Sequence, residues 1–172
     1  MKILPINEVI RHKQEQHVKN EREILKVIKP LELTDKINPS LIQKIKNPFL
    51  ISLIDCWKDE HNLYFLFPYH CGGELFTLMR MYERLASSSV TFYTAEIVSG
   101  LAYLHSVDVV YRDLKPENIM LDRRGHVKLT DFGCIKESAD QELNFTFCGT
   151  VEYMAPEILN RSGYVDCFFQ IP

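Results

Sequence analysis

The chain has 172 residues, of which 46% are hydrophobic and 25% are charged, and its formal net charge is −3. This length and composition are typical of a globular protein that can bury a sizeable core. The acidic balance argues against a nucleic-acid partner, because phosphate-binding surfaces carry an excess of Lys and Arg. No apolar run reaches the roughly 18 residues of a membrane span, and no signal peptide is evident. We expect a cytoplasmic protein, with the nucleus as a second location.

The five cysteines are widely spaced and form no C-x-x-C pair. Zinc sites usually draw two of their ligands from such a pair, so we expect no zinc site. In a reducing compartment the thiols are expected to be free.

Residues 7–28 are expected to form one helix. Val18, Glu21, Leu25 and Ile28 fall on one face at helical spacing, which places a carboxylate in line with apolar neighbours. A buried charge needs a partner, so either Glu21 is paired or the helix rolls to let it reach water. Pro30 ends this helix.

The rest of the chain alternates short strands with helices. A polar segment at 29–46, which contains two prolines, is interpreted as a surface insertion. The order of long helix, strand group, Gly-Gly joint and helical part predicts an α+β fold with two lobes and a cleft between them. The elements expected after the insertion are strands at 49–57 and 63–69, a break at 71–76, a helix at 89–104, and two short strands around the turn at 122–125.

Three oxygen-bearing side chains then suggest phosphoryl-transfer chemistry. Asp113, Asn118 and Asp131 come from two loops next to short strands, and Lys115 lies two residues after Asp113. Mg²⁺ prefers such hard oxygen ligands together with substrate phosphates. A carboxylate can also orient an attacking hydroxyl group, and a lysine can stabilise a transferred phosphate. Taken singly, each of these residues is an ordinary turn residue.

Three sequence motifs in a fixed order favour phosphoryl-transfer residues over ordinary turn residues. "YRDLKPENIM" (111–120), "DFG" (131–133) and "APE" (155–157) stand in the order of the protein-kinase signature. Tyr111, in place of the usual His, resembles the AGC group of serine/threonine kinases. "TFCGTVEYMAPEIL" (146–159) resembles the ribosomal protein S6 kinases, and the first 28 residues also resemble cyclic-AMP-dependent kinase. The resemblance covers residues 1–28 and about 47–164.

This resemblance implies an ATP and Mg²⁺ site. Asp113 is similar to the catalytic base, Lys115 to the γ-phosphate contact, and Asn118 and Asp131 to the Mg²⁺ ligands. Lys2 matches the lysine that binds the α- and β-phosphates and Glu21 its helix partner, so an ion pair would satisfy both; the alternative for Lys2 is a solvated terminal lysine. The hinge that contacts adenine through its backbone corresponds to residues 67–70, with Phe67, Pro68 and His70. Pro68 departs from the usual acidic residue and has no N–H.

The resemblance also implies a protein substrate and an upstream kinase. Glu74 and Glu117 match carboxylates that read basic residues near the target Ser or Thr, because Arg pairs well with carboxylates. Glu74 also lies near the ribose in the family. Thr150 matches a threonine that contacts the catalytic Asp. Thr146 matches the activation-loop phosphosite, with Arg112, Lys136 and His17 as its basic partners; alternatively Thr146 is an ordinary loop threonine. The apolar spine of the family corresponds to Leu25, Leu53, Tyr111 and Phe132.

Two parts of the family pattern are not found. The seven glycines form no G-x-G-x-x-G loop, and "VDCFFQIP" departs from the pattern after Asp166. We therefore expect a bilobal kinase fold truncated at both ends, with a residual N-lobe at 1–69 and a partial C-lobe at 70–172. Two functions remain open. The chain is part of an ATP-dependent serine/threonine kinase, or it is a catalytically impaired kinase that acts as an interaction or competitor protein.

Overall fold

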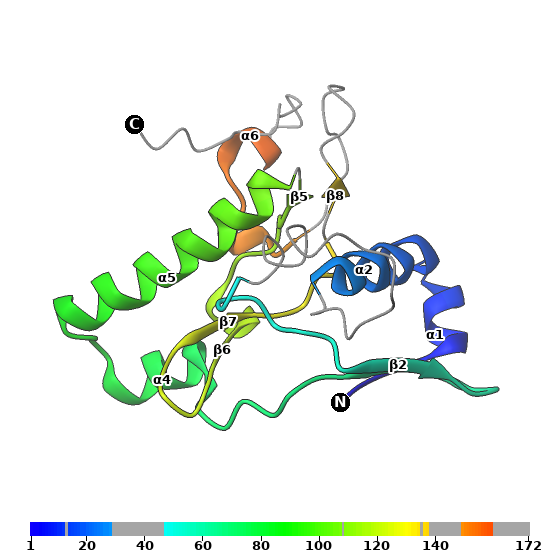
Figure 1. Cartoon of the computed structure of the whole chain (residues 1–172). Helices are drawn as coiled ribbons and strands as arrows, with labels where there is room; N and C mark the ends of the chain where they lie inside the picture. The colour runs from blue at the N-terminus through cyan, green and yellow to red at the C-terminus, as the bar shows by residue number, and fades with distance from the viewer. Residues whose placement is uncertain (13, 29–46, 108, 135, 138–148, 160–172) are drawn as a thin grey trace.

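The computed structural model describes residues 1–12, 14–28, 47–107, 109–134, 136–137 and 149–159 (Figure 1). The insertion expected at 29–46 and the residues after 159 lie outside these ranges. Helices and short strands are mixed along the chain, as the predicted α+β class requires.

A three-stranded antiparallel sheet forms the N-terminal part. Its strands are β1 (Lys2–Pro5), β2 (Asp55–Lys58) and β3 (Asn62–Leu66), in the order β1-β3-β2. The helices α1 (Ile6–Arg11) and α2 (Glu15–Ile28) lie on one side of this sheet (Figure 1). Strand alternation explains this packing, since Phe65 on β3 is 2% exposed and Leu4 and Leu63 contact the same core.

The single helix expected over residues 7–28 is wrong, because two helices with a break between them occupy this stretch. The backbone N–H of Gln14 donates to the carbonyl of Val9, five residues back, at 2.9 Å. That bond spans one residue more than an α-helical turn, so the helix direction changes before α2 begins at Glu15. Within α2 the predicted inward face is present: Val18 packs against the core, and Glu21 and Leu25 are buried.

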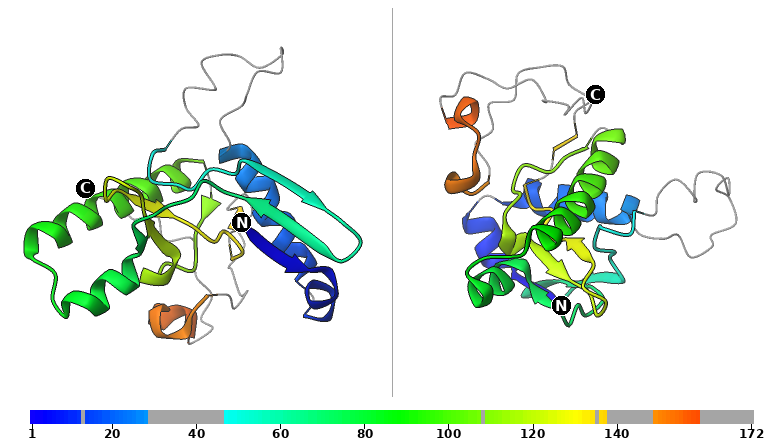
Figure 2. Two further views of the ribbon diagram at one scale, coloured as in Figure 1. Left: turned by 90° about the horizontal axis from the view of Figure 1, so that it is seen from below. Right: turned by 90° about the vertical axis from the view of Figure 1, so that its left-hand side faces the viewer.

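The C-terminal part is built around the long helix α5 (Ser87–Ser106), which includes the predicted helix at 89–104. It packs against the hairpin β6 (Ile119–Leu121) and β7 (Val127–Leu129), whose turn at 122–125 was also predicted. Figure 2 shows α5 beside this hairpin from two further directions. The remaining elements are β4 (Gly73–Glu74), α4 (Leu75–Tyr82), β5 (Val109–Val110), η2 (Pro116–Asn118), β8 (Lys136–Glu137), η3 (Val151–Tyr153) and α6 (Pro156–Leu159).

The strands expected at 49–57 and 63–69 are shorter in the structure. Residues 51–54 form no strand, because the backbone around Leu50 pairs instead with Leu129 of β7 through a single parallel bridge. The N–H of Ile51 donates to the carbonyl of Leu129 at 3.0 Å, and the N–H of Leu129 donates to the carbonyl of Phe49 at 2.7 Å. This segment therefore joins the N-terminal sheet to the C-terminal part.

One apolar core runs through both parts. It contains Leu25 and Phe65 from the N-terminal part, and Leu104, Leu129 and Phe132 from the C-terminal part. All four residues expected in the apolar spine belong to this core, with Leu25 and Phe132 at 0%, Tyr111 at 2% and Leu53 at 3% exposure. The Tyr111 and Phe132 rings meet edge to face with centroids 5.7 Å apart.

The expectation of free thiols is confirmed for Cys56 and Cys71 and is wrong for Cys134, which is disulfide-bonded. Within the described ranges, no helix combines the length and apolar character that crossing a bilayer requires.

Candidate active site

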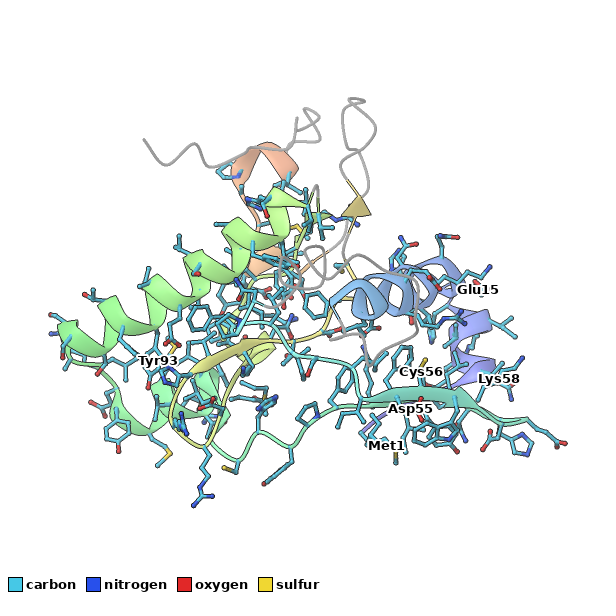
Figure 3. All side chains as sticks on the ribbon, in the orientation of Figure 1. Met1, Glu15, Asp55, Cys56, Lys58 and Tyr93 are labelled. Atoms are coloured by element: carbon cyan, nitrogen blue, oxygen red, sulfur yellow. The ribbon has the colours of Figure 1, made fainter. Side chains whose placement is uncertain are left out.

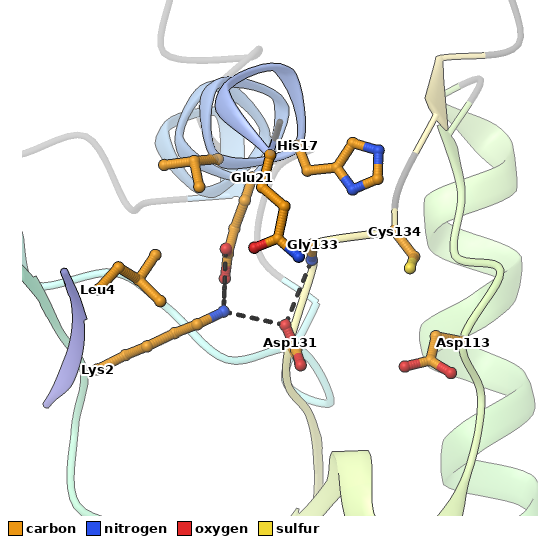
Figure 4. A pocket seen from close by; sticks show the side chains of 10 residues that line it. Lys2, Leu4, His17, Glu21, Asp113, Asp131, Gly133 and Cys134 are labelled. Carbon is orange, nitrogen blue, oxygen red and sulfur yellow. Dashed lines mark hydrogen bonds and ion pairs between the residues drawn. The ribbon is translucent and has the colours of Figure 1, made fainter. Parts of the chain in front are cut away.

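Lys2 joins the two parts of the molecule. Its Nζ atom lies 2.8 Å from Oε1 of Glu21 on α2, and 3.0 Å from Oδ1 of Asp131, which follows β7 (Figure 4). Glu21 is 2% exposed, so the alternative in which its carboxylate reaches water is excluded. The ion pair expected from the sequence is present, and Lys2 is held by two carboxylates rather than left solvated.

The electrostatics of this cluster follow from burial and charge. Burial acts to lower the pKa of Lys2, but the carboxylates of Glu21 and Asp131 outweigh it and hold that pKa above its ordinary value. Burial also raises the pKa of Glu21, and the attraction of Lys2 opposes that rise. Lys2 is therefore fully charged at neutral pH, and the ion pair is what keeps a charged Glu21 in a buried position.

A second cluster surrounds Asp113. The hydroxyl of Thr150 donates to Oδ1 of Asp113 at 2.8 Å, and Nζ of Lys115 donates to the same hydroxyl at 2.6 Å. Nζ of Lys115 also lies 3.1 Å from Oδ2 of Asp113. Thr150 lies 37 residues from Asp113 in the sequence, so the orientation of the carboxylate depends on the tertiary fold. Such a positioned carboxylate suits a general base.

Asn118 links this cluster to the β6–β7 hairpin. Its Nδ2 atom donates to the carbonyl oxygen and to Oδ2 of Asp113, both at 2.9 Å. The N–H and the hydroxyl of Thr130 both donate to the Asn118 carbonyl, at 2.9 and 3.0 Å. Asn118 is 6% exposed, so these bonds satisfy a buried amide and fix it relative to Asp113.

The donor set fits a magnesium ion. The amide nitrogen of Asn118 is bound to Asp113, which leaves its Oδ1 atom as a ligand, and Asp131 uses Oδ1 for Lys2 and for the N–H of Gly133. Mg²⁺ is usually held by one or two protein oxygens together with phosphates and water. Among the described residues there is no group of three or more His, Cys, Asp or Glu side chains placed to hold a metal. An amide and a carboxylate sharing an ion with phosphates require no such group.

A cavity of about 190 Å³ opens beside the Lys2 cluster. Figure 4 shows Asp113 across this space from Lys2, on a different segment of the chain. Because both clusters border it, charged groups of both signs face one volume. The cavity is lined by Lys2, Leu4, Gln14, His17, Val18, Glu21, Asp113, Asp131, Gly133 and Cys134.

Two lining or neighbouring residues adopt backbone angles that side chains rarely take. Arg112 has φ of 63° and Asp131 has φ of 56°. Residues in this left-handed region are held there by their surroundings, and they concentrate at functional sites. Nε of Arg112 donates to the carbonyl of Cys134 at 2.6 Å, while its buried Nη1 atom has no partner among the described residues. This unpaired guanidinium nitrogen is available for an anion.

The predicted hinge connects β3 to β4. Phe67 packs against the core, and Pro68 and His70 are half-buried. Burial lowers the pKa of His70, and the charge of Lys128 lowers it further, so the imidazole is neutral near pH 7. The hinge is tied to the β6–β7 hairpin, because the N–H of Gly72 donates to the carbonyl of Leu121 at 3.0 Å.

The two carboxylates predicted to read the substrate come from contacting elements. Glu74 ends β4 opposite Met120 of β6, and Glu117 lies in η2, which contacts both β4 and α4. Glu74 is exposed, and the Oε2 atom of Glu117 is buried without a partner in the described part of the chain. A buried carboxylate oxygen without a partner costs folding free energy, so Glu117 is suited to accept a hydrogen bond from a ligand.

The predicted phosphosite is only partly visible. Thr146 and the side chain of Lys136 lie outside the described residues, whereas His17 lines the cavity and Arg112 lies beside Cys134. Their grouping around Thr146 stays a prediction.

The sequence did not point to two other polar groups. Glu96 on α5 is 7% exposed and accepts a hydrogen bond from the Val127 N–H at 2.8 Å, and its other oxygen lies 2.6 Å from Nδ1 of His126. Its place in line with Tyr93 and Gly100 on the inner face of α5 is the signal that would have identified it. Gln14, which lines the cavity, carries no such signal.

Comparison with known families identifies the class. The sequence model of the family described as "Protein kinase domain" matches residues 1–168. The chain therefore belongs to the protein kinase family. The α+β architecture predicted from the sequence, with a bilobal kinase-like fold, is confirmed.

Individual relatives indicate the group of protein kinases to which the chain is similar. The chain is 50% identical over 164 residues to the cAMP-dependent protein kinase catalytic subunit 3 of Drosophila melanogaster, covering 95% of this chain and 25% of that protein. It is 47% identical to the human cAMP-dependent protein kinase catalytic subunit PRKX, covering 95% of this chain and 40% of that protein. It is 39% identical to serine/threonine-protein kinase Sgk2 of Rattus norvegicus, covering 95% of this chain and 41% of that protein.

These relatives are AGC-group kinases, so the predicted group is confirmed. The chain spans between about a quarter and two fifths of their lengths. A specific closeness to the ribosomal S6 kinases stays a prediction.

Proposed function

We propose that this chain carries the catalytic core of an ATP-dependent kinase that phosphorylates Ser and Thr residues of proteins, in basic sequence contexts, as a step of cytoplasmic signalling. The observation that carries the proposal is the pair of clusters around one cavity: Lys2 with Glu21 and Asp131, and Asp113 with Lys115 and Thr150. We place the division between the lobes between residues 69 and 70.

Each cluster suits one part of phosphoryl transfer. Lys2, held by its two carboxylates, binds phosphate oxygens of the nucleotide, and Asn118 and Asp131 hold Mg²⁺. The metal would supply positive charge against the phosphates. Asp113 accepts the proton of the substrate hydroxyl, and Thr150 and Lys115 orient the Asp113 carboxylate. Lys115 also faces the transferred phosphate. The backbone of residues 67–70 binds adenine.

Substrate choice and activation follow from the remaining charges. Glu117, whose buried oxygen lacks a partner, and Glu74 on the adjoining strand bind basic residues near the target Ser or Thr. Phosphorylation of Thr146 by an upstream kinase adds nearly two negative charges, which Arg112, Lys136 and His17 bind. The unpaired Nη1 atom of Arg112 supports that role.

The test is a phosphotransfer assay on the full chain with an Arg-bearing Ser peptide. Asp113→Asn is expected to lower kcat by 10²- to 10⁴-fold while nucleotide binding is retained. Glu117→Gln is expected to lower kcat/KM about tenfold for the Arg peptide, and much less for a peptide with Ala in place of Arg. Lys19→Met, which alters an exposed lysine of α2, is the matched control and should change neither value.

The alternative is a catalytically impaired kinase that competes for the partners of a complete enzyme. It is favoured if the chain neither binds Mg-nucleotide nor transfers phosphate, yet still binds the Arg-bearing peptide. Phosphotransfer that Asp113→Asn leaves unchanged would contradict the assignment of the base.

A further inference from the structure

The face of the N-terminal sheet that points away from α1 and α2 carries a row of apolar side chains. The register places Ile3 of β1, Tyr64 of β3 and Trp57 of β2 opposite one another, so all three project from the same face. Trp57 is 44% and Ile3 48% exposed. Seen from below in Figure 2 (left), no described helix lies over this face.

The two aromatic rings form a fixed platform. The Trp57 and Tyr64 rings are stacked, with centroids 5.3 Å apart and planes 9° from parallel. The Tyr64 hydroxyl donates to Oδ2 of Asp59 at 2.7 Å, and Oδ1 of Asp59 accepts the N–H groups of His61 and Asn62 at 2.8 and 2.7 Å. The hairpin turn therefore holds Tyr64, and Tyr64 in turn supports one face of Trp57.

Carboxylates lie on both sides of Trp57 in the sequence, two residues before it and two residues after it. Asp59 follows β2. The hydrogen bond from Tyr64, and then those from the N–H groups of His61 and Asn62, hold the pKa of Asp59 below its ordinary value, so Asp59 is charged at neutral pH. Asp55 lies two residues before Trp57 and accepts the N–H of Cys56 at 2.8 Å. Strand alternation assigns Lys58 and Cys56 to the opposite face, and Figure 3 shows Cys56 directed toward the helices. An exposed indole between carboxylates is complementary to a planar cation.

We propose that this face, defined as Ile3, Trp57 and Tyr64 with Asp55 and Asp59, docks a partner polypeptide through an arginine side chain. The guanidinium group stacks on the exposed face of Trp57 and is drawn there by the two carboxylates, while an apolar neighbour of the arginine covers Ile3. This surface is separate from Glu74 and Glu117, and its assignment does not depend on the proposed kinase activity.

The only tryptophan of the chain reports on this binding directly. The probes are three peptides, acetyl-Gly-Leu-X-Leu-Gly-amide with X as Arg, Lys or citrulline, titrated against Trp57 fluorescence in the full chain. They contain no Ser or Thr and cannot be phosphorylated. Citrulline keeps the planar shape of arginine and removes its charge. We expect the Arg peptide to bind about five- to tenfold more tightly than the citrulline peptide, with Lys between them and with weaker binding at high salt.

Variants locate the site. Trp57→Ala should abolish binding of a fluorescein-labelled Arg peptide measured by anisotropy, and Asp59→Asn should weaken it two- to fivefold. Glu74→Gln/Glu117→Gln, which removes the proposed substrate carboxylates, should leave the Trp57 signal unchanged. Equal binding of the Arg and citrulline peptides would overturn the proposal, and that comparison needs no variant to fold. Loss of the Trp57 signal in the double variant would overturn it as well.

Discussion

The cluster at Lys2 makes a quantitative prediction about stability. Lys2→Met removes both Nζ contacts to Glu21, at 2.8 and 3.0 Å, and leaves a carboxylate that is 2% exposed without a partner. Breaking a buried ion pair in this way costs about 3–5 kcal/mol. Two features reduce the cost here: the Lys2 side chain is 33% exposed, and Glu21 can take up a proton. We expect a loss of about 2 kcal/mol in unfolding free energy above pH 7.

The pH dependence has a definite sign. Burial raises the pKa of Glu21 and Lys2 opposes this rise, so removing Lys2 raises the pKa further above its ordinary value of 4.5. The folded variant then binds a proton more tightly than the unfolded chain does. Its stability relative to the wild type falls as pH increases from 4.5 through the folded pKa. The loss is therefore smallest near pH 5 and largest at pH 7 to 8.

The assay is urea unfolding of the full chain at pH 5, 6, 7 and 8, with Lys19→Met as a surface control expected within about 0.5 kcal/mol of wild type. The double variant Lys2→Met/Glu21→Leu should recover most of the loss, because it removes the unpaired charge. A loss that is the same at every pH, or a double variant as unstable as the sum of the single ones, would refute the reasoning.

Three further predictions concern the scaffold. Glu96→Ala should lower the thermal midpoint, since it leaves a buried backbone N–H unpaired at a cost of about 1–3 kcal/mol, and an unchanged midpoint would contradict this. Gly149→Ala should destabilise more than Gly125→Ala in chemical unfolding, because both have positive φ but only at Gly149 would the added Cβ lie 2.6 Å from a backbone oxygen; equal losses would argue against the close approach. In an NMR titration the pKa of the Asp59 carboxyl should lie below its ordinary value of 3.8, so the stability that this carboxylate gives the turn is lost as pH falls through the folded pKa. Asp59→Asn should lower the raised pKa of Tyr64 toward 10. An ordinary pKa at either group would exclude the hydrogen bond between them.

The sequence predicted those features that depend on local pattern. Helix α5 includes the helix predicted at 89–104, and the β6–β7 turn follows from its Asp and Gly. The partner of Glu21 was predicted by a different route, because periodicity alone allowed the carboxylate to be paired or solvated, and the family resemblance supplied Lys2.

Features set by particular backbone contacts were not predicted. The break between α1 and α2 depends on one backbone bond to Val9, which has no signature in residue type. The strand expected from residue 49 is shortened because the backbone near Leu50 pairs with Leu129, far along the chain. The aromatic stack on β2 and β3 requires a strand register that composition does not give. At Leu50 a contact distant in sequence overrides the local preference for a strand.

The most direct test of the nucleotide site is calorimetric titration of the full chain with a non-hydrolysable ATP analogue, with and without Mg²⁺. The account predicts that Mg²⁺ strengthens binding to the wild type and to Lys19→Met, and that Asp131→Asn loses most of this gain. If the wild type binds no nucleotide, or if Asp131→Asn retains the full effect of Mg²⁺, the proposed site is contradicted.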